Sequence, residues 1–567
     1  MPALILGIGF ESRSQIYKDG SGVLDQAINV FVAPGTNPNE RDADGNNVLH
    51  LLCKWKIPYP MLIKTSFIFG VDPTAKNKAG QTPMDVLTST PRNAKYNSFQ
   101  EEAAAALQQA LDVTEAFTLR ARPDSVKGDQ FNLLSLDGGG IRGVITARTL
   151  QMIERMVGRD VHECFHWYAG TSTGGIIATM LGVLKRSPEY CWQLYLNRKR
   201  DMFSGSKLKR VYDIIMGADK NSTQNLEDLI RNELQIAMTS MGQNKSSYTM
   251  QDIAAHKGFP KLTIVSLDVT HKPARPTYFR NYEHLEFTDQ FIAEETRLAT
   301  ELGVWTPIAL TKILRATSAA PTYFLPVSED NRRFVDGGLT ANNPISVLVQ
   351  ECDTLSLHPA GAFRGIRNHV TLALSLGTGG KAAALRAEHS GLYGDIQLFK
   401  LFKEQSLGKD GKDHERARAR FMSEQVPYLR LSPVGINVGL ATVENSDVMT
   451  MLWETDAYML KNKATLQWVA DVLCGNVQFK RREQSSTADL EQIIKEKTAE
   501  NYQLKNELDT LKLELQRRAA ALLQQAANDT VNERHVTNLN GEEAAEVLLP
   551  KSPEAHATTH CCRCNLL

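Results

Sequence analysis

Three glycine-rich turns in this chain bring together residue types that suit acyl transfer. The first turn, 137–143 (DGGGIRG), follows the apolar run 131–136. The second turn, 170–174 (GTSTG), directly follows 167–169, and the third is 336–338 (DGG). A serine can attack an ester carbonyl, an aspartate can accept the serine proton, and backbone N–H groups can stabilise the resulting oxyanion. Together the three turns indicate ester hydrolysis through an acyl-enzyme.

The second turn has the form G-x-S-x-G, which makes Ser172 a candidate nucleophile. Gly170 and Gly174 remove side chains from a sharp bend between a strand and a helix, so that the hydroxyl stands exposed at its tip. The helix predicted over 174–184 points its N-terminal amides at the same place and favours developing negative charge there.

The first turn admits two readings, because Gly138, Gly140 and Gly143 also match the dinucleotide-binding fingerprint. That fold requires an acidic residue at the end of the next strand, and the nearest one, Asp160, lies earlier in a polar connection. No Gly-Lys-Ser/Thr follows, which excludes a phosphate-binding P-loop. The remaining interpretation is a row of oxyanion donors, with Arg142 suited to an anionic head group.

The third turn supplies a base, Asp336, for the serine hydroxyl. A free aspartate has a pKa near about 3.9, so Asp336 must lie close to Ser172 in a dry site that raises its pKa. A Ser-Asp-His triad is the competing arrangement, because four histidines follow Asp336 in the chain. They are His358, His369, His389 and His414.

The turns are positioned by a predicted strand, helix and strand. Apolar runs at 131–136 and 167–169 predict two strands, and apolar periodicity over 144–156 predicts the helix between them. A right-handed crossover of this kind places both turns at the carboxyl edge of one parallel sheet. A further buried strand is predicted at 262–267, and 185–251 is predicted to be helical.

In this order the turns resemble the patatin-like phospholipase family. The resemblance covers roughly 129–380 and includes 316–321 (ATSAAP) and 374–379 (LSLGTG). It implies an α/β three-layer hydrolase with a central, mainly parallel sheet. It also implies a Ser-Asp dyad that needs no cofactor or metal and is independent of calcium. In this chain Ser172 is then the nucleophile, Asp336 the base, and the oxyanion hole is lined by Gly138, Gly139 and Gly140. The other motif positions are Arg142, Gly143, Gly170, Gly174, Gly337 and Gly338.

Residues 1–118 contain an internal sequence repeat with a period of 35. The pattern G-x-x-P at 35–38 returns at 70–73, and 44–50 (DGNNVLH) returns as 79–85 (AGQTPMD). This resembles the ankyrin repeat, in which His50 is structural. The pairing with the turns above resembles the ankyrin-bearing calcium-independent phospholipases. Such a short array can recruit a protein, position the catalytic domain or serve as scaffold.

The rest of the chain divides by composition. We expect a linker at 119–128, the catalytic domain at 129–400 and its helical continuation at 401–484, with a basic patch at 416–420. Heptads over 485–527 predict a coiled coil that makes the protein a homodimer, with a monomeric packing helix as the alternative. The seam positions are Ile494, Asn501, Leu508, Leu515 and Leu522, with Leu490, Leu504 and Leu511 between them.

Residues 528–567 predict a disordered tail with a lipidation site. Cys564 stands fourth from the end of the sequence before a terminal leucine, a pattern for geranylgeranyl attachment, and Cys561 and Cys562 are candidates for acyl chains. An unmodified reactive tail and a metal site that uses His556, His560 and these cysteines are the alternatives.

Composition narrows the class of protein. Lysine plus arginine and aspartate plus glutamate both number 64, so the net charge gives no indication of nucleic-acid binding. No apolar run approaches the roughly 20 residues that span a bilayer. The eight cysteines are sparse except at the end of the sequence, which fits a reducing, cytoplasmic setting.

The sequence therefore predicts a lipid acyl hydrolase that cleaves fatty-acyl esters of glycerophospholipids or lysophospholipids at a membrane surface. It would be a peripheral membrane protein held by its lipidated tail and, if bacterial, a secreted effector acting in a host cell. The alternatives are a neutral-lipid or galactolipid acyl hydrolase, a transacylase, and an inert ankyrin and coiled-coil scaffold.

Overall fold

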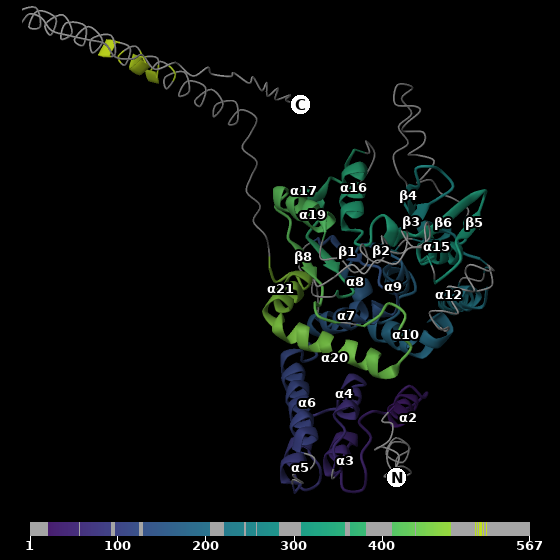
Figure 1. Cartoon of the computed structure of the whole chain (residues 1–567), viewed down its shortest axis with the longest axis vertical. Helices are drawn as coiled ribbons and strands as arrows, with labels where there is room; N and C mark the ends of the chain where they lie inside the picture. The colour runs from purple at the N-terminus through teal and green to yellow at the C-terminus, as the bar shows by residue number, and fades with distance from the viewer. Residues whose placement is uncertain are drawn as a thin grey trace, which may run out of the picture. The chain divides into compact units, whose positions relative to one another are not determined.

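A computed structural model describes residues 21–477 and scattered positions between 505 and 518. The gaps within the first range are 56, 92–96, 124–128, 204–219, 243–244, 246, 257, 283–307, 322, 358–362, 381–410 and 437. The chain divides into two compact units, 1–479 and 480–567. All elements named below belong to the first unit (Figure 1).

A mixed sheet, eight-stranded over the described residues, forms the centre of this unit, in the order β5-β6-β3-β2-β1-β7-β8 with β4 paired to β3. The strands from β3 to β8 in this order are parallel, whereas β4, β5 and β6 are antiparallel to their neighbours. The predicted mainly parallel sheet is thus parallel at its centre and antiparallel at one side. The strands are β1 (Asn132–Leu136), β2 (Trp167–Thr171), β3 (Lys261–Asp268), β4 (Arg275–Arg280), β5 (Val327–Glu329), β6 (Arg332–Asp336), β7 (Leu372–Leu376) and β8 (Tyr428–Leu431).

Helices cover both faces of the sheet, which is why β1 (NLLSL) is apolar along most of its length and fully buried. Leu134 and Leu136 pack with one set of helices and Leu133 with the other, as the two-residue period of a strand requires. Figure 1 shows α16, α17 and α19 on one side of the sheet and α7, α10 and α20 on the other.

The part of this unit that contains the sheet is called the catalytic region below, after its predicted function, and carries helices from residue 143 onward. They are α7 (Gly143–Val157), α8 (Val161–Cys164), α9 (Thr173–Gly182), α10 (Pro188–Phe203), α12 (Lys220–Ser240), α13 (Met250–Ala254), α15 (Leu310–Thr317), α16 (Ile345–Ser356), α17 (Ile366–His369), α19 (Lys412–Ser423), α20 (Asn445–Lys461) and α21 (Lys463–Leu473), with short 3-10 turns η2 (Gly140–Arg142) and η3 (Gly337–Leu339). The predicted crossover is present as β1, α7 and β2, and its two strands are parallel.

Five helices precede the sheet within the described residues from 21 onward: α2 (Ser21–Phe31), α3 (Val48–Lys54), α4 (Pro60–Ile68), α5 (Pro83–Ser89) and α6 (Asn97–Ala116). Each of the two repeated motifs begins a helix with a capping box. Asn47 and His50 form it at α3, and Thr82 and Asp85 form it at α5. His50 Nε2 also lies 2.9 Å from the carbonyl oxygen of Gln81, so this histidine joins one repeat to the next. The ankyrin assignment of this N-terminal helical module remains a prediction.

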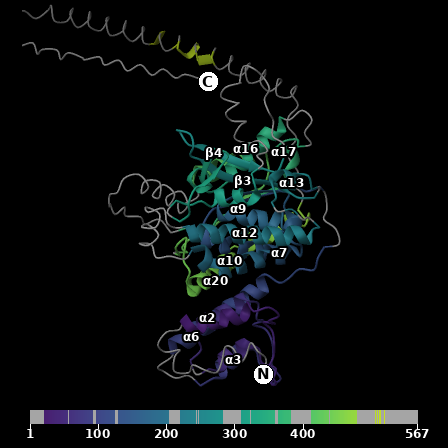
Figure 2. The same cartoon turned by 90° about the vertical axis from the view of Figure 1, so that its right-hand side faces the viewer.

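The N-terminal helical module packs directly on the catalytic region, with α2, α4 and α6 against α20 (Figure 1, Figure 2). Phe67 meets Trp453 edge-on at 6.0 Å between ring centroids, and Phe69 meets Trp192 at 5.4 Å. Arg148 of α7 donates from Nη1 to the carbonyl of Ile68 at the end of α4. One continuous hydrophobic cluster runs through both regions.

Two predicted segments lie wholly or mostly outside the described residues. Of the coiled coil, scattered positions between 505 and 518 are helical, with Leu508 and Leu511 more than half exposed. The tail with Cys561, Cys562 and Cys564 falls outside the described part. Within that part, no helix combines the length and the apolar composition that crossing a membrane requires.

Candidate active site

Ser172 stands at the bend between β2 and α9 in a strained backbone conformation. Its φ of 54° and ψ of −125° lie in a region that residues other than glycine rarely adopt. The bend is held by Thr317, whose Oγ1 accepts from the Ser172 N–H at 2.8 Å. A Cβ on Gly170 would overlap with the backbone of Gly174, and a Cβ on Gly174 with the carbonyl of Leu136. The G-x-S-x-G spacing is therefore a requirement of close backbone packing.

Asp336 ends β6 and faces Ser172. Strand β6 pairs with β3, the neighbour of β2, which brings the two turns to the same end of the sheet. The Ser172 hydroxyl donates to Asp336 Oδ2 at 2.7 Å, and the N–H of Gly338 donates to Oδ1 at 2.7 Å. Gly337 is required because a Cβ there would overlap with the carbonyl of Val265. The predicted nucleophile and its predicted base thus lie within hydrogen-bonding distance.

Burial changes the proton affinity of this aspartate. Asp336 is fully buried, and the resulting loss of solvation raises its pKa to about 7, against smaller lowering effects of Gly338, Ser172 and Arg315. A carboxylate with a pKa near 7 is a far better base towards a hydroxyl than a free aspartate.

Gly139 and Gly140 are the predicted oxyanion-hole residues whose N–H groups are left without a partner inside the described part of the protein. Gly140 has a φ of +57°. Gly138 differs from the prediction, because its N–H donates to the carbonyl of Asn342 at 3.1 Å and is not available to a substrate. Thr173, the residue after the nucleophile, adds a helix N-terminal N–H beside Ser172.

Arg142 also differs from the prediction. Its side chain is fully buried, and Nη1 donates to the carbonyl of Gly379 at 3.1 Å, beyond the end of β7. Burial lowers the pKa of Arg142 to about 10, which leaves it protonated at neutral pH. Arg142 therefore fastens the first turn to a neighbouring strand end and does not line the cavity at Ser172. The next motif residue, Gly143, lets α7 approach α9, because a Cβ there would lie 2.5 Å from Thr173 Oγ1.

A cavity opens at Ser172. A second one adjoins it and continues between α9, α10, α12 and α15. Their walls are almost entirely apolar, and four residues line both: Ile176, Tyr195, Met202 and Leu226. The sequence did not indicate these four residues, because no motif marks them, and it gave no role to Thr317 within the motif 316–321.

Two of the four histidines of the competing triad can be placed. His369 packs against Phe131 and Phe363 at the start of β1, the opposite end of the sheet from Ser172. His414 lies 2.9 Å from the hydroxyl of Tyr428 through Nδ1. His358 and His389 lie outside the described residues.

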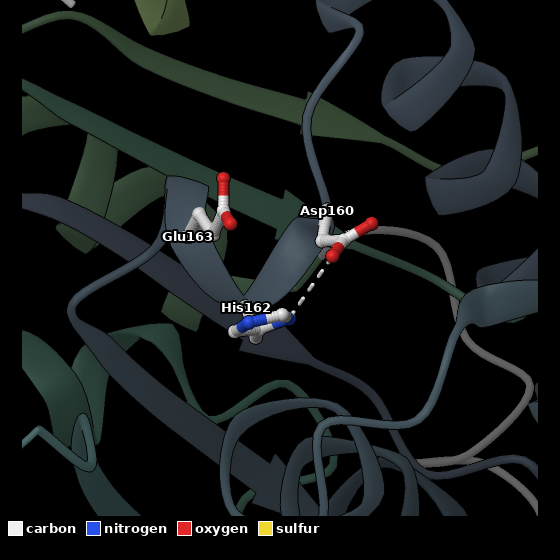
Figure 3. Close-up of side chains that lie close together, drawn as sticks. All are labelled: Asp160, His162 and Glu163. Atoms are coloured by element: carbon white, nitrogen blue, oxygen red, sulfur yellow. Dashed lines mark ion pairs between the residues drawn. The ribbon is translucent and has the colours of Figure 1, made fainter. Parts of the chain in front are cut away.

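Asp160, His162 and Glu163 form a separate polar group on the surface (Figure 3). Asp160 and His162 approach to 4.0 Å, while the Glu163 carboxylate accepts two hydrogen bonds from Arg122, at 2.7 and 2.9 Å. This is the arrangement of surface ion pairs, and it is remote from the chemistry described above.

Comparison with known proteins agrees with this geometry. Residues 134–349 match the family of patatin-like phospholipases. The 85/88 kDa calcium-independent phospholipase A2 of Rattus norvegicus is 28% identical over 72% of this chain and 48% of its own length. The intracellular phospholipase A2 of Caenorhabditis elegans is 26% identical over 81% of this chain and 41% of its own length. For the human calcium-independent phospholipase A2-gamma the identity is 31% over 43% of this chain and 28% of its own length.

This chain thus spans less than half the length of these three relatives. The matched segment includes the last three residues of β1, the serine turn and the aspartate turn. Over residues 134–349, this chain is therefore similar to the patatin-like phospholipase family.

Proposed function

We propose that the protein is a lipid acyl hydrolase that cleaves fatty-acyl esters of glycerophospholipids or lysophospholipids through the dyad of Ser172 and Asp336. The observation that carries the proposal is the 2.7 Å hydrogen bond from Ser172 Oγ to a buried carboxylate, at the mouth of an apolar cavity. The relatives named as phospholipases support this substrate class.

The mechanism follows from the two side chains and the glycine turn. Asp336 takes the Ser172 proton as Oγ attacks the ester carbonyl, and the oxyanion receives hydrogen bonds from the N–H groups of Gly139 and Gly140. Asp336 then returns the proton to the departing alcohol oxygen, which leaves an acyl chain on Ser172. In the second half, water gives a proton to Asp336 as its oxygen attacks the acyl carbonyl. The bond to Ser172 Oγ then breaks, Asp336 returns the proton to Oγ, and the fatty acid leaves.

The chain itself supplies the nucleophile, the base and the oxyanion donors. We therefore expect fatty-acid release to continue when calcium is chelated. The cavity beyond Ile176 offers an apolar environment for the acyl chain of the scissile ester, and transfer of that chain from water favours binding. The intact dyad argues against the inert scaffold.

A neutral-lipid acyl hydrolase or transacylase is a second candidate, favoured by the position of Arg142. In the sequence, Arg142 favours an anionic head group. In the structure, however, its side chain is buried and donates a hydrogen bond to the carbonyl of Gly379, so it does not bind a head group. Preference for phospholipid over neutral lipid must then come from residues at the cavity mouth or from the membrane surface.

The test is fatty-acid release from phospholipid vesicles and from triacylglycerol emulsions, with and without a calcium chelator. The native chain is compared with Ser172→Ala, which differs from it by a single hydroxyl group. Release from vesicles that survives chelation and disappears in the variant supports the proposal. Preferential release from the emulsion supports the second candidate, and equal release by both chains contradicts the dyad.

Dimerisation through 485–527 and anchoring through Cys564, Cys561 and Cys562 are further proposals that rest on the sequence. Sedimentation of the full chain and mass analysis of the protein isolated from a eukaryotic host test them. A monomer and an unmodified tail would contradict both.

A further inference from the structure

The residues between β8 and α20 form a connecting segment, 432–444, whose described residues (all but 437) include contacts with the first glycine turn. Its start follows β8, and Val434 bridges to Gly380 beyond the end of β7. Its end leads into α20 at Asn445, where the Thr442 hydroxyl donates to Asp447 in the first turn of the helix at 2.6 Å. The segment is thus held at both ends.

In its middle this segment touches the oxyanion hole. The carbonyl of Leu440 accepts from the N–H of Ile141 at 3.0 Å, and it lies so close to Gly140 that a Cβ there would overlap with it. Leu440 and Gly140 also line the cavity that opens at Ser172. Because Gly140 supplies an oxyanion donor, the position of Leu440 bears directly on the direction of that N–H group.

Asn445 joins this segment to two other parts of the molecule. Its Oδ1 accepts from Lys199 Nζ of α10 at 2.5 Å, and its Nδ2 donates to Asp25 Oδ1 of α2 at 2.6 Å. Lys199 is buried and donates a second bond to the carbonyl of Leu196 at 2.8 Å, so it forms a fixed point. One amide therefore connects the N-terminal helical module, the wall of the cavity and the connecting segment.

We propose that Asn445 and Asp25 are positioning residues for the oxyanion hole, acting through Leu440. The N-terminal helical module thereby contributes to catalysis without touching the substrate, which selects among the three roles left open for it by the sequence. This inference rests on the proposed acyl-hydrolase function. A shift of about 1 Å in a catalytic group can cost on the order of a hundredfold in rate, so a loosened segment has a measurable effect.

The test exchanges the two partners in the full-length chain. Asn445→Asp alone places two carboxylates against each other. The double variant Asp25→Asn with Asn445→Asp provides an amide donor at position 25 for the carboxylate at position 445 and keeps the bond from Lys199. Asn462→Ala serves as the control, because Asn462 lies at the other end of α20 and its Nδ2 donates to the carbonyl of Tyr458.

Three quantities are measured for each variant: kcat and KM for a soluble fatty-acyl ester, and the affinity for a fatty-acyl trifluoromethyl ketone by calorimetry. Ser172 adds to the carbonyl of the ketone, whose oxygen becomes an oxyanion. The affinity for the ketone therefore reports on the oxyanion hole independently of turnover. We expect Asn445→Asp to lower kcat by about ten- to a hundredfold with KM within about twofold, and to weaken the ketone in parallel. The double variant recovers most of both, and Asn462→Ala changes neither.

A merely structural Asn445 would lower the thermal midpoint while leaving kcat and ketone affinity at native values, and this result would overturn the inference. A double variant no better than Asn445→Asp would also overturn it. If the native chain releases no fatty acid from any ester, the proposed function fails. The ketone affinities then decide the positioning question separately, with equal values in all chains counting against it.

Discussion

The glycine turns and the cavity wall meet at Ser172 but depend on the sequence in different ways. In the turns, added Cβ atoms at Gly170, Gly174 and Gly337 would overlap with neighbouring backbone, so residue identity is dictated by geometry. In the wall, residues such as Ile176 and Leu229 present apolar surface, which several residue types can provide. The residues of the turns can therefore hardly change without loss of the site, whereas the residues of the cavity wall, and with them the substrate preference, can vary.

The largest effect is expected for Ser172→Ala. Loss of the nucleophile should lower kcat by roughly three orders of magnitude or more, as for other enzymes in which the nucleophile acts with its base as a unit. Stability should change little, since the side chain only bonds to Asp336. Ester hydrolysis and thermal unfolding of both chains check this. A variant with native turnover would place the nucleophile elsewhere.

Asp336→Asn should reduce kcat almost as strongly and should also reveal the cost of burying the charge. Because burial raises the folded-state pKa to about 7 from an ordinary 3.8, the folded protein holds this proton more tightly than the unfolded chain. The stability conferred by that proton is complete below about 3.8 and is lost as the pH rises through about 7. Asparagine carries no charge, so its stabilising effect relative to the native chain should be larger at about pH 8 than at about pH 4.

Thermal midpoints at the two pH values test the stability part of this prediction. In the native chain, kcat/KM should rise with pH around a midpoint near 7, because the ionised carboxylate is the base. A midpoint below about 5 would mean that Asp336 is solvated in the working enzyme.

Gly140→Ala should produce an intermediate effect, with a fall in kcat of about a hundredfold. The new Cβ would meet the Leu440 carbonyl and displace an oxyanion donor. Gly80→Ala is the matched control, since Gly80 also has a positive φ but no atom within 4 Å of an added Cβ. Both variants carry the conformational strain, about 1 kcal/mol, but only the first should lose activity. Equal kcat values for Gly140→Ala and Gly80→Ala would mean that Gly140 does not contribute to the oxyanion hole.

The smallest effect is expected in the wall. Ile176 lines both cavities near Ser172, and Met180 lies one helical turn further along α9, about 6 Å deeper. Phenylalanine at position 176 should reduce kcat/KM for long and medium acyl chains alike. Phenylalanine at position 180 should reduce kcat/KM for long acyl chains alone, by about tenfold. A panel of esters of increasing chain length measures this. Identical profiles for both variants would mean that the acyl chain does not follow α9.

The sequence predicted Ser172 and Asp336 as the dyad because close backbone packing requires the glycines beside them. It did not identify the partners of Gly138 and Arg142, since Asn342 and Gly379 lie about two hundred positions further along the chain and come near only in the folded sheet. The short strands β4, β5 and β8 were also missed, because they have few residues over which a two-residue period can appear.

The hydrogen bond between Asp25 of the N-terminal helical module and Asn445 could not be predicted, for the same reason. Asn445 belongs to no motif, and its importance arises from three segments that meet in space. Tertiary contacts of this kind depend on the register of distant elements, on which local periodicity carries no information.

The single hydrophobic cluster shared by the N-terminal helical module and the catalytic region has a consequence for biosynthesis. Phe67 and Phe69 leave the ribosome long before Trp192 and Trp453, the rings that cover them. At about 5–20 residues per second, the wait for Trp453 lasts on the order of tens of seconds, during which an apolar surface is open to solvent. A nascent chain of this design calls for chaperone protection until α20 has emerged, and prematurely terminated chains should aggregate.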